Sequence, residues 1–365
     1  YFGARDDENV QIAIHTTAAF GLVAGVLMTL VGVLLSPQIL VWMGTPDAVM
    51  DESLTYLQIY FMGSLGSVMY NIFVGTLQAM GDSKHPLYYL IASSIVNVVL
   101  DILFIAVFHA GVGGAALATI ISQFLSAFLC MFRLMKNKGC EKLYLRKIRF
   151  NWEMLKQIVR FGLPSGVQNS IIALANVVVQ SNINSFGEMA MAGVGAFSKI
   201  EGFGFLPITS FTMAMTTFIS QNLGAKQHER AKQSARFGIF MTALLAELIG
   251  VVVFIFAPQL IAAFDSNPAV VESGVEKART SALFFFLLAY SHAVSAILRG
   301  AGKAVVPMMV MMIFWCVVRV AFLMITVPLT HSIQMLYWVY PLTWGLSSLA
   351  FLWYYKKADW LHALD

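Results

Sequence analysis

Charged side chains are scarce in this sequence. Of 365 residues, only 12% are Asp, Glu, Lys or Arg and 59% are hydrophobic, with a mean hydropathy of +0.75. A soluble globular chain carries about 25% charged residues, so this surface is suited to something other than water. The net charge of +4 is small, and the basic residues do not cluster as nucleic-acid binding requires. The composition therefore predicts a protein of the lipid bilayer with no nucleic-acid partner.

Cysteines and catalytic motifs are equally few. Cys130, Cys140 and Cys316 lie far apart and form neither a CxxC pair nor a metal-ligand spacing, so we expect free thiols. We find no HExxH, GxSxG or Walker A motif, and GAGK at 300–303 lacks the Walker spacing. These absences argue against an enzyme and against a cofactor. The start shows no signal-peptide pattern, and because it is Tyr1 and not Met, we expect a fragment.

Long apolar runs take the place of charge. A helix of about 20 apolar residues crosses a bilayer, and backbone groups inside a bilayer must pair within helices or a closed barrel. We therefore predict an all-α polytopic membrane protein with ten spans, at residues 8–35, 50–79, 86–108, 112–136, 154–186, 188–222, 226–256, 270–300, 304–328 and 331–356. Four prolines are expected at helix boundaries: Pro37, Pro86, Pro258 and Pro307. Two others should kink the spans that contain them, Pro164 and Pro207.

Basic residues gather between the fourth and fifth spans. Residues 133–149 hold one Glu against seven basic residues, namely Arg133, Lys136, Lys138, Lys142, Arg146, Lys147 and Arg149. By the positive-inside rule this loop is cytoplasmic. The loops predicted on the opposite side carry no Lys or Arg. We therefore expect both ends of the chain to be cytoplasmic.

The sequence also contains a weak internal repeat with an offset of 221 residues. This offset pairs Gly-Ala at 3–4 with 224–225, Pro-Gln at 37–38 with 258–259, and LQAMGDSKHP at 77–86 with LRGAGKAVVP at 298–307. A unit of this length holds six spans, and an even number preserves sidedness, so the halves are parallel repeats. We predict an N-lobe remnant of four helices at 1–137, a basic cytoplasmic linker at 138–153 and a six-helix C-lobe at 154–365. The first two helices of the N-lobe would then be missing.

Several motifs carry a family resemblance. They are NVVLD at 97–101, GVGGAALATIISQ at 111–123, GLPSGVQNS at 162–170, NSFGEMAMAGVGAFSKIEGFGFLP at 184–207 and QNLGAK at 221–226. In this order the chain resembles the bacterial branch of the multidrug and toxic compound extrusion (MATE) family, starting near its third helix. The resemblance implies a V-shaped pair of lobes around a cleft in the bacterial inner (plasma) membrane. It also implies a monomeric antiporter that exports cationic, amphiphilic organic compounds against inward Na⁺ or H⁺.

Asp101 is the strongest candidate for coupling to an ion. It lies in an otherwise apolar run, where an acid is costly unless it is partnered or functional. Asn97 lies one turn earlier on the same face, and Thr119 on the next helix reaches a similar depth. Their oxygens suit a small hard cation such as Na⁺, whereas a protonated Asp101 would carry H⁺ instead. By resemblance, the three residues match the family's N-lobe cation site; the alternative is an Asp that Asn97 caps for packing.

A polar stripe marks the span at 154–186. Its amides are spaced along one face, with a further amide near the start: Asn169, Asn176, Gln180, Asn184 and Gln168. Lipid-facing helices do not carry such a stripe. Hydrogen bonding between helices and the lining of a wet cavity both account for it, and the family resemblance favours the cleft.

Two more charges lie at mid-depth, Glu201 and Arg319. Gly202, Gly204 and Pro207 loosen the helix after Glu201, which suits binding of a cationic substrate. We predict that both residues line the cleft; the alternative is that they pair with each other. A lipid-linked oligosaccharide flippase shares this lobe plan and is the alternative function. Its cleft should be strongly basic, whereas here we count only Lys199 and Arg319 within the membrane.

Overall fold

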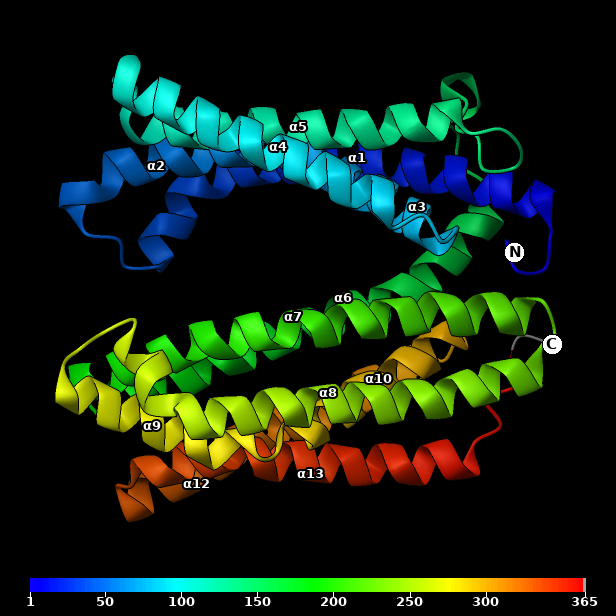
Figure 1. Ribbon diagram of the computed structural model, residues 1–365. Helices are drawn as coiled ribbons and strands as arrows, with labels where there is room; N and C mark the ends of the chain where they lie inside the picture. The colour runs from blue at the N-terminus through cyan, green and yellow to red at the C-terminus, as the bar shows by residue number, and fades with distance from the viewer. Residues whose placement is uncertain (364–365) are drawn as a thin grey trace. The chain divides into compact units, whose positions relative to one another are not determined.

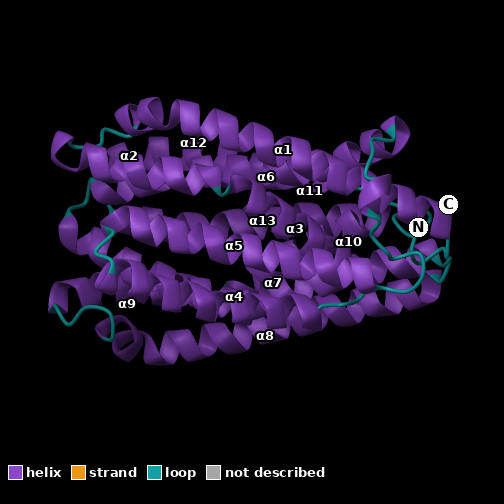
Figure 2. Ribbon diagram, turned by 90° about the horizontal axis from the view of Figure 1, so that it is seen from above, coloured by secondary structure: helices purple, strands orange, loops and turns teal. Residues whose placement is uncertain are grey.

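The computed structural model describes residues 1–363, and all regular secondary structure in them is helical (Figure 2). The chain forms two compact units, Tyr1–Ile158 and Val159–Asp365. The division falls inside one long helix, shortly after the predicted linker at 138–153.

Unit 1 contains five α-helices, followed by the start of a sixth (Figure 1). The complete helices are α1 (Asp7–Trp42), α2 (Asp47–Met62), α3 (Ser64–Ala79), α4 (Lys84–Ile102), which continues as the π-helix η1 (Leu103–Val107), and α5 (Gly111–Lys136). α1 packs on α2 and α3, and α5 packs on α2, α3 and α4. Leu77, Cys130 and Leu134 are fully buried in the resulting core.

The segment after α5 folds back onto α1. It contains the short 3₁₀-helix η2 (Leu145–Lys147). The Nε2 of His15 accepts a hydrogen bond from the backbone N–H of Tyr144 at 3.0 Å, and its Nδ1 lies 2.6 Å from the carbonyl of Gln11. His15 is thus a buried structural residue that ties the basic segment to α1.

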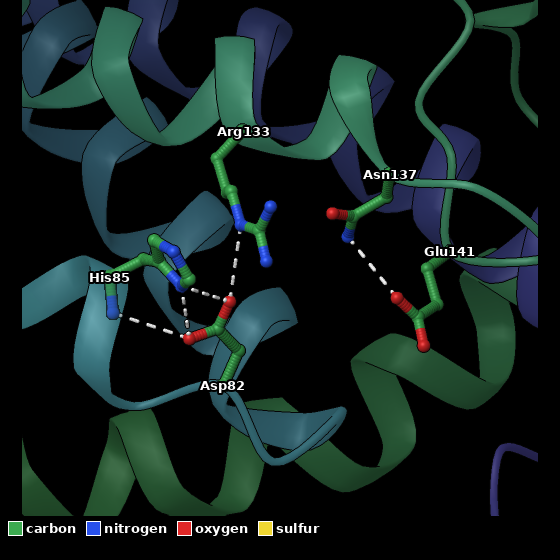
Figure 3. A network of polar contacts seen from close by, with 5 residues as sticks. All are labelled: Asp82, His85, Arg133, Asn137 and Glu141. Atoms are coloured by element: carbon green, nitrogen blue, oxygen red, sulfur yellow. Dashed lines mark hydrogen bonds and ion pairs between the residues drawn. The ribbon is translucent and has the colours of Figure 1, made fainter.

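A polar network holds the loop between α3 and α4 against α5 (Figure 3). The carboxylate of Asp82 lies 2.8 Å from Nδ1 of His85 and accepts a hydrogen bond from Nε of Arg133 at 3.3 Å. Burial by itself raises the pKa of the Asp82 carboxyl, but hydrogen bonds from His85 and Arg133 outweigh it and hold the pKa below its ordinary value. Beside this network, Asn137 donates to Glu141 at 3.2 Å.

Unit 2 contains most of α6 and all the later helices. Their bounds are α6 (Trp152–Asn184), α7 (Glu188–Gly224), α8 (His228–Ala262), α9 (Pro268–Ala282), α10 (Phe285–Gly300), α11 (Val305–Met311), the π-helix η3 (Met312–Val318), α12 (Arg319–Thr330) and α13 (Ile333–Lys357). α7 packs against α8, α9 and α10, and α13 packs against α9, α10 and α12.

The helix boundaries repeat with the offset found in the sequence. Four pairs of helix starts are 221 residues apart: Asp7 and His228, Asp47 and Pro268, Ser64 and Phe285, and Lys84 and Val305. In both units the first of these helices is followed by a pair of helices that meet at a bend, of 43° between α2 and α3 and of 54° between α9 and α10. The span that follows contains a π-helix in each unit. The internal repeat is therefore a structural one.

Seven helical segments of the described residues are long and apolar enough to cross a membrane, and the two bent pairs raise the number to nine if each is one span. The prediction of continuous helices at 50–79 and 270–300 was wrong. The first breaks at Gly63; at the second break, the carboxylate of Glu247 accepts a hydrogen bond from the N–H of Phe286 at the start of α10. The range 331–356 forms α13, which is not among the seven segments because its Trp and Tyr residues lower its mean hydropathy.

Two of the predicted proline boundaries were also wrong. Pro37 and Pro258 lie inside α1 and α8, whereas Pro86 and Pro307 lie in the first turns of α4 and α11 as expected. A long membrane helix tolerates a proline because neighbouring groups compensate for the missing N–H bond. Pro164 and Pro207 lie inside α6 and α7.

Candidate functional site

Asn97 and Asp101 lie one turn apart near the end of α4. Nδ2 of Asn97 and Oδ1 of Asp101 are both buried without a hydrogen-bond partner among the described residues. Such atoms are rare because an unpaired buried polar group costs about 1–3 kcal/mol. The π-helix η1 begins two residues after Asp101, and π-helical turns are frequent at functional sites. The pair is therefore suited to a ligand that supplies the missing contacts.

Thr119 lies on α5, the helix that packs against α4. Its Oγ1 donates a hydrogen bond to the carbonyl of Ala115 at 3.0 Å. This bond occupies the hydroxyl proton and leaves the oxygen lone pairs able to face a cation. Within residues 1–363 no hydrogen bond joins Thr119 to Asn97 or Asp101, so their meeting at one ion stays a prediction.

A polar cavity of about 260 Å³ lies beside this pair in unit 1. Asn97 lines it together with hydroxyl and amide side chains from α3, α4 and α5, among them Asn71, Ser93 and Ser126. A space lined by such groups accommodates water or a hydrated ion. Asn97 therefore borders a hydrophilic space, one helical turn from Asp101.

The amides of α6 divide into two groups. Gln168 is buried, and its Nε2 lies 2.7 Å from the sulfur of Met311, so Gln168 points into unit 2. Asn169, Asn176 and Gln180 are exposed. Gln180 donates a hydrogen bond to Asn184 on the same helix at 2.8 Å, and within residues 1–363 none of the exposed amides bonds to another helix. These contacts favour a wet surface over hydrogen bonding between helices.

Arg319 and Lys277 form a buried cationic cluster with the ring of Tyr340. Arg319 and Lys277 are 2% and 3% exposed. The ammonium of Lys277 lies 3.4 Å from the ring centroid, and the guanidinium carbon of Arg319 lies 4.7 Å from it. Nη2 of Arg319 donates to Oγ1 of Thr343 at 2.9 Å. Glu201 on α7 is attracted electrostatically by both cations.

The sequence-based prediction placed Glu201 and Arg319 in the lining of a cleft, with an ion pair between them as the alternative. No ion pair joins Glu201 to either cation in the part of the chain that the structure describes. Lys277 was missed, although helical spacing carries a signal for it. Glu272, Glu276 and Arg279 share one face of α9, whereas Lys277 shares another with the buried Val270 and Gly274. The count of membrane basic residues as Lys199 and Arg319 alone was therefore too low.

The two cations repel each other across the ring. Because both distances run to one centroid, the charges lie at most about 8 Å apart, the sum of those distances. At an effective dielectric constant of about 20, two unit charges at this distance repel by about 2 kcal/mol. One carboxylate balances only one of them, so the cluster carries an excess of positive charge when all three groups are ionised.

Long apolar helices, an internal duplication and a buried acid with unpaired atoms together define a multi-pass membrane transporter. Residues 1–103 and 164–325 match the family model MatE. The chain therefore belongs to the MATE family, whose members are transporters and not enzymes, and the predicted resemblance is confirmed.

Curated relatives and solved structures agree with this assignment. The chain is 27% identical over 368 residues to the probable multidrug resistance protein YoeA of Bacillus subtilis, covering 97% of this chain and 78% of that protein. It is 31% identical over 291 residues to the probable multidrug resistance protein YpnP of the same organism, covering 80% and 65%. The crystal structure of MATE in the bent conformation has a TM-score of 0.91 at 24% identity, covers 97% of this chain and 80% of that one, and supports the fold.

Proposed function

We propose that the chain belongs to a secondary active multidrug exporter that moves cationic, amphiphilic organic compounds out of the cytoplasm against inward Na⁺ or H⁺. The observation that carries the proposal is the Asn97–Asp101 pair, with its buried unpartnered atoms beside a polar cavity. Family membership and the printed names of the Bacillus subtilis relatives support the export of drugs.

The coupling ion binds at Asp101 in this proposal. A Na⁺ ion takes oxygens from Asp101, Asn97 and Thr119, or a proton neutralises the Asp101 carboxylate. Either ion removes the uncompensated charge from the low-dielectric interior. Coupling then follows because ion-bound and ion-free states favour different access conformations.

The substrate binds in a cleft lined by the exposed amides of α6. Asn169, Asn176 and Gln180 supply hydrogen-bonding groups, while Gln168, Glu201 and Arg319 support the cleft from inside unit 2. The proposal has further parts. The chain crosses the bacterial inner membrane ten times, with both chain ends in the cytoplasm, and it works as a monomer with a V-shaped pair of lobes.

The flippase alternative is weaker. Lys277 adds a positive charge beside Arg319, as a pyrophosphate headgroup would require. Both cations are almost fully buried, however, and Glu201 lies near them. A flippase site has to admit a large anionic headgroup.

Asp101→Asn in reconstituted protein tests the export proposal. The change removes the charge at nearly constant volume, so we expect folding to persist and coupled dye efflux to fall by at least tenfold. Glu247→Gln is the matched control, because it removes another membrane carboxylate whose hydrogen bond to Phe286 an amide oxygen can replace. Sodium and pH gradients are varied independently. Undiminished efflux by Asp101→Asn, with unchanged dependence on both ions, would return Asp101 to a packing role.

A further inference from the structure

The cationic cluster of unit 2 lacks hydrogen-bond acceptors. Nε of Arg319 is buried without a partner among the described residues, and Arg319 makes its one side-chain hydrogen bond, to Thr343, through Nη2. Lys277 donates no hydrogen bond to any residue in 1–363; its ammonium faces the rings of Tyr340 and Tyr337, at 3.4 and 5.6 Å from their centroids. Aromatic faces attract a cation but accept no strong hydrogen bond.

Glu201 does not fill this need. Its carboxylate interacts electrostatically with both cations but forms no ion pair with either within the described residues. A guanidinium and an ammonium normally bind carboxylates directly when both are buried. The cluster therefore has donors and positive charge to spare, on side chains held by packing.

We propose that Lys277 and Arg319 form a binding site for one monovalent anion inside unit 2. The anion accepts hydrogen bonds from Nε of Arg319 and Nζ of Lys277, and Glu201 competes with it for the same charges. When all three groups are ionised, two cations and one carboxylate leave a single positive charge, which one monovalent anion balances. A chloride ion and the carboxylate group of an organic compound share this chemistry, and neither source rests on the proposed export of cationic compounds.

The position of the cluster in the fold supports a functional role. Arg319 follows directly on the π-helix η3, which replaces α-helical hydrogen bonding at the centre of this span. A π-helical turn changes the direction in which the following side chains point, and such turns are frequent at functional sites. Trp315 within η3 lies 5.5 Å from the guanidinium of Arg319, so the π-helix also packs the cation from a second side.

Equilibrium binding of ³⁶Cl⁻ to the purified protein in detergent, in a chloride-free sulfate buffer, tests the inference without any transport step. We expect saturable binding of about one ion per chain in the wild type. Lys277→Met should weaken it at least tenfold, and Glu201→Gln should tighten it severalfold because a competing carboxylate is removed. Lys199→Met is the matched control, since this lysine is exposed on α7 and its removal should leave binding unchanged.

Sodium benzoate, added to the same assay, distinguishes the two sources of the anion. Displacement of ³⁶Cl⁻ by benzoate supports a site for organic carboxylates, whereas resistance to benzoate assigns the site to chloride. Should Lys277→Met unfold, tighter binding by Glu201→Gln remains the decisive measurement, because a merely structural carboxylate would not compete with chloride. Absence of saturable binding in the wild type, or equal binding by wild type and Glu201→Gln, would overturn the inference. Failure here leaves the result of the Asp101→Asn experiment untouched.

Discussion

The close approach of α7 and α9 at Gly193 makes a quantitative prediction. A Cβ on Gly193 would lie 2.6 Å from the carbonyl oxygen of Val270 and 2.7 Å from the backbone nitrogen of Gly274. Backbone atoms cannot swing aside as a side chain can, so the helices must separate. Overpacking of this kind costs about 1–3 kcal/mol, and the better helix propensity of Ala returns up to about 1 kcal/mol. We expect Gly193→Ala to lower the free energy of unfolding by about 1–2 kcal/mol.

The same helix provides the control. At Gly195 no atom lies within 4 Å of the position that an alanine methyl would take, so Gly195→Ala should be neutral or slightly stabilising. At about 2–4 °C per kcal/mol for a unit of this size, tryptophan-detected melting in detergent should separate the two variants by several degrees. Because α7 carries Glu201 and α9 carries Lys277, Gly193→Ala should also weaken chloride binding. Equal melting temperatures for the two alanine variants would refute the close packing of α7 on α9.

Three further predictions concern other parts of the chain. Asp82→Asn should lower the free energy of unfolding, measured with urea, by about 1 kcal/mol near pH 7. Because folding lowers the pKa of the Asp82 carboxyl, the stabilisation by this group is present above its unfolded pKa near 4 and is lost as pH falls through its folded pKa. A difference in stability between wild type and Asp82→Asn that grows in acid would contradict this prediction. Cysteine at Gln180 should react faster with a membrane-impermeant maleimide than cysteine at Leu174, and the reverse order would mean that the amide stripe is not wet. Cys140 should react in the folded protein and the fully buried Cys130 only after unfolding, so early labelling of Cys130 would argue against the core of unit 1.

The sequence was sufficient wherever one physical requirement decided the outcome. The length of apolar runs located the helices, since a bilayer admits few other structures. The cost of a buried acid singled out Asp101 before any geometry was known. Bends were not predictable, because Gly63 is one glycine among many and only the packing around it decides whether a helix continues.

Lys277 shows a different limit. Its segment reads VESGVEKART, and helical spacing places Glu272, Glu276 and Arg279 on one face with Lys277 apart from them. In the fold, Glu276 and Arg279 border an open cavity of about 720 Å³, while Lys277 turns toward Tyr340. Helical spacing therefore sets Lys277 apart from the other charges, whereas the fold is needed to show that it faces Tyr340.

The duplication makes the difference in charge between the two units informative. The 221-residue offset pairs Thr119 with Tyr340, and pairs Asn97 with the residue directly before Arg319. Corresponding helices of one repeated scaffold thus hold an acid with its amide in unit 1 and a buried base in unit 2, although the offset pairs Asp101 itself with Phe322. Packing alone gives no reason for this, because apolar residues fill a core at lower cost than either charge. Buried charges of opposite sign are expected if the two units bind ions of opposite sign, and a ligand that binds one unit then biases the conformations of the transporter differently from a ligand that binds the other.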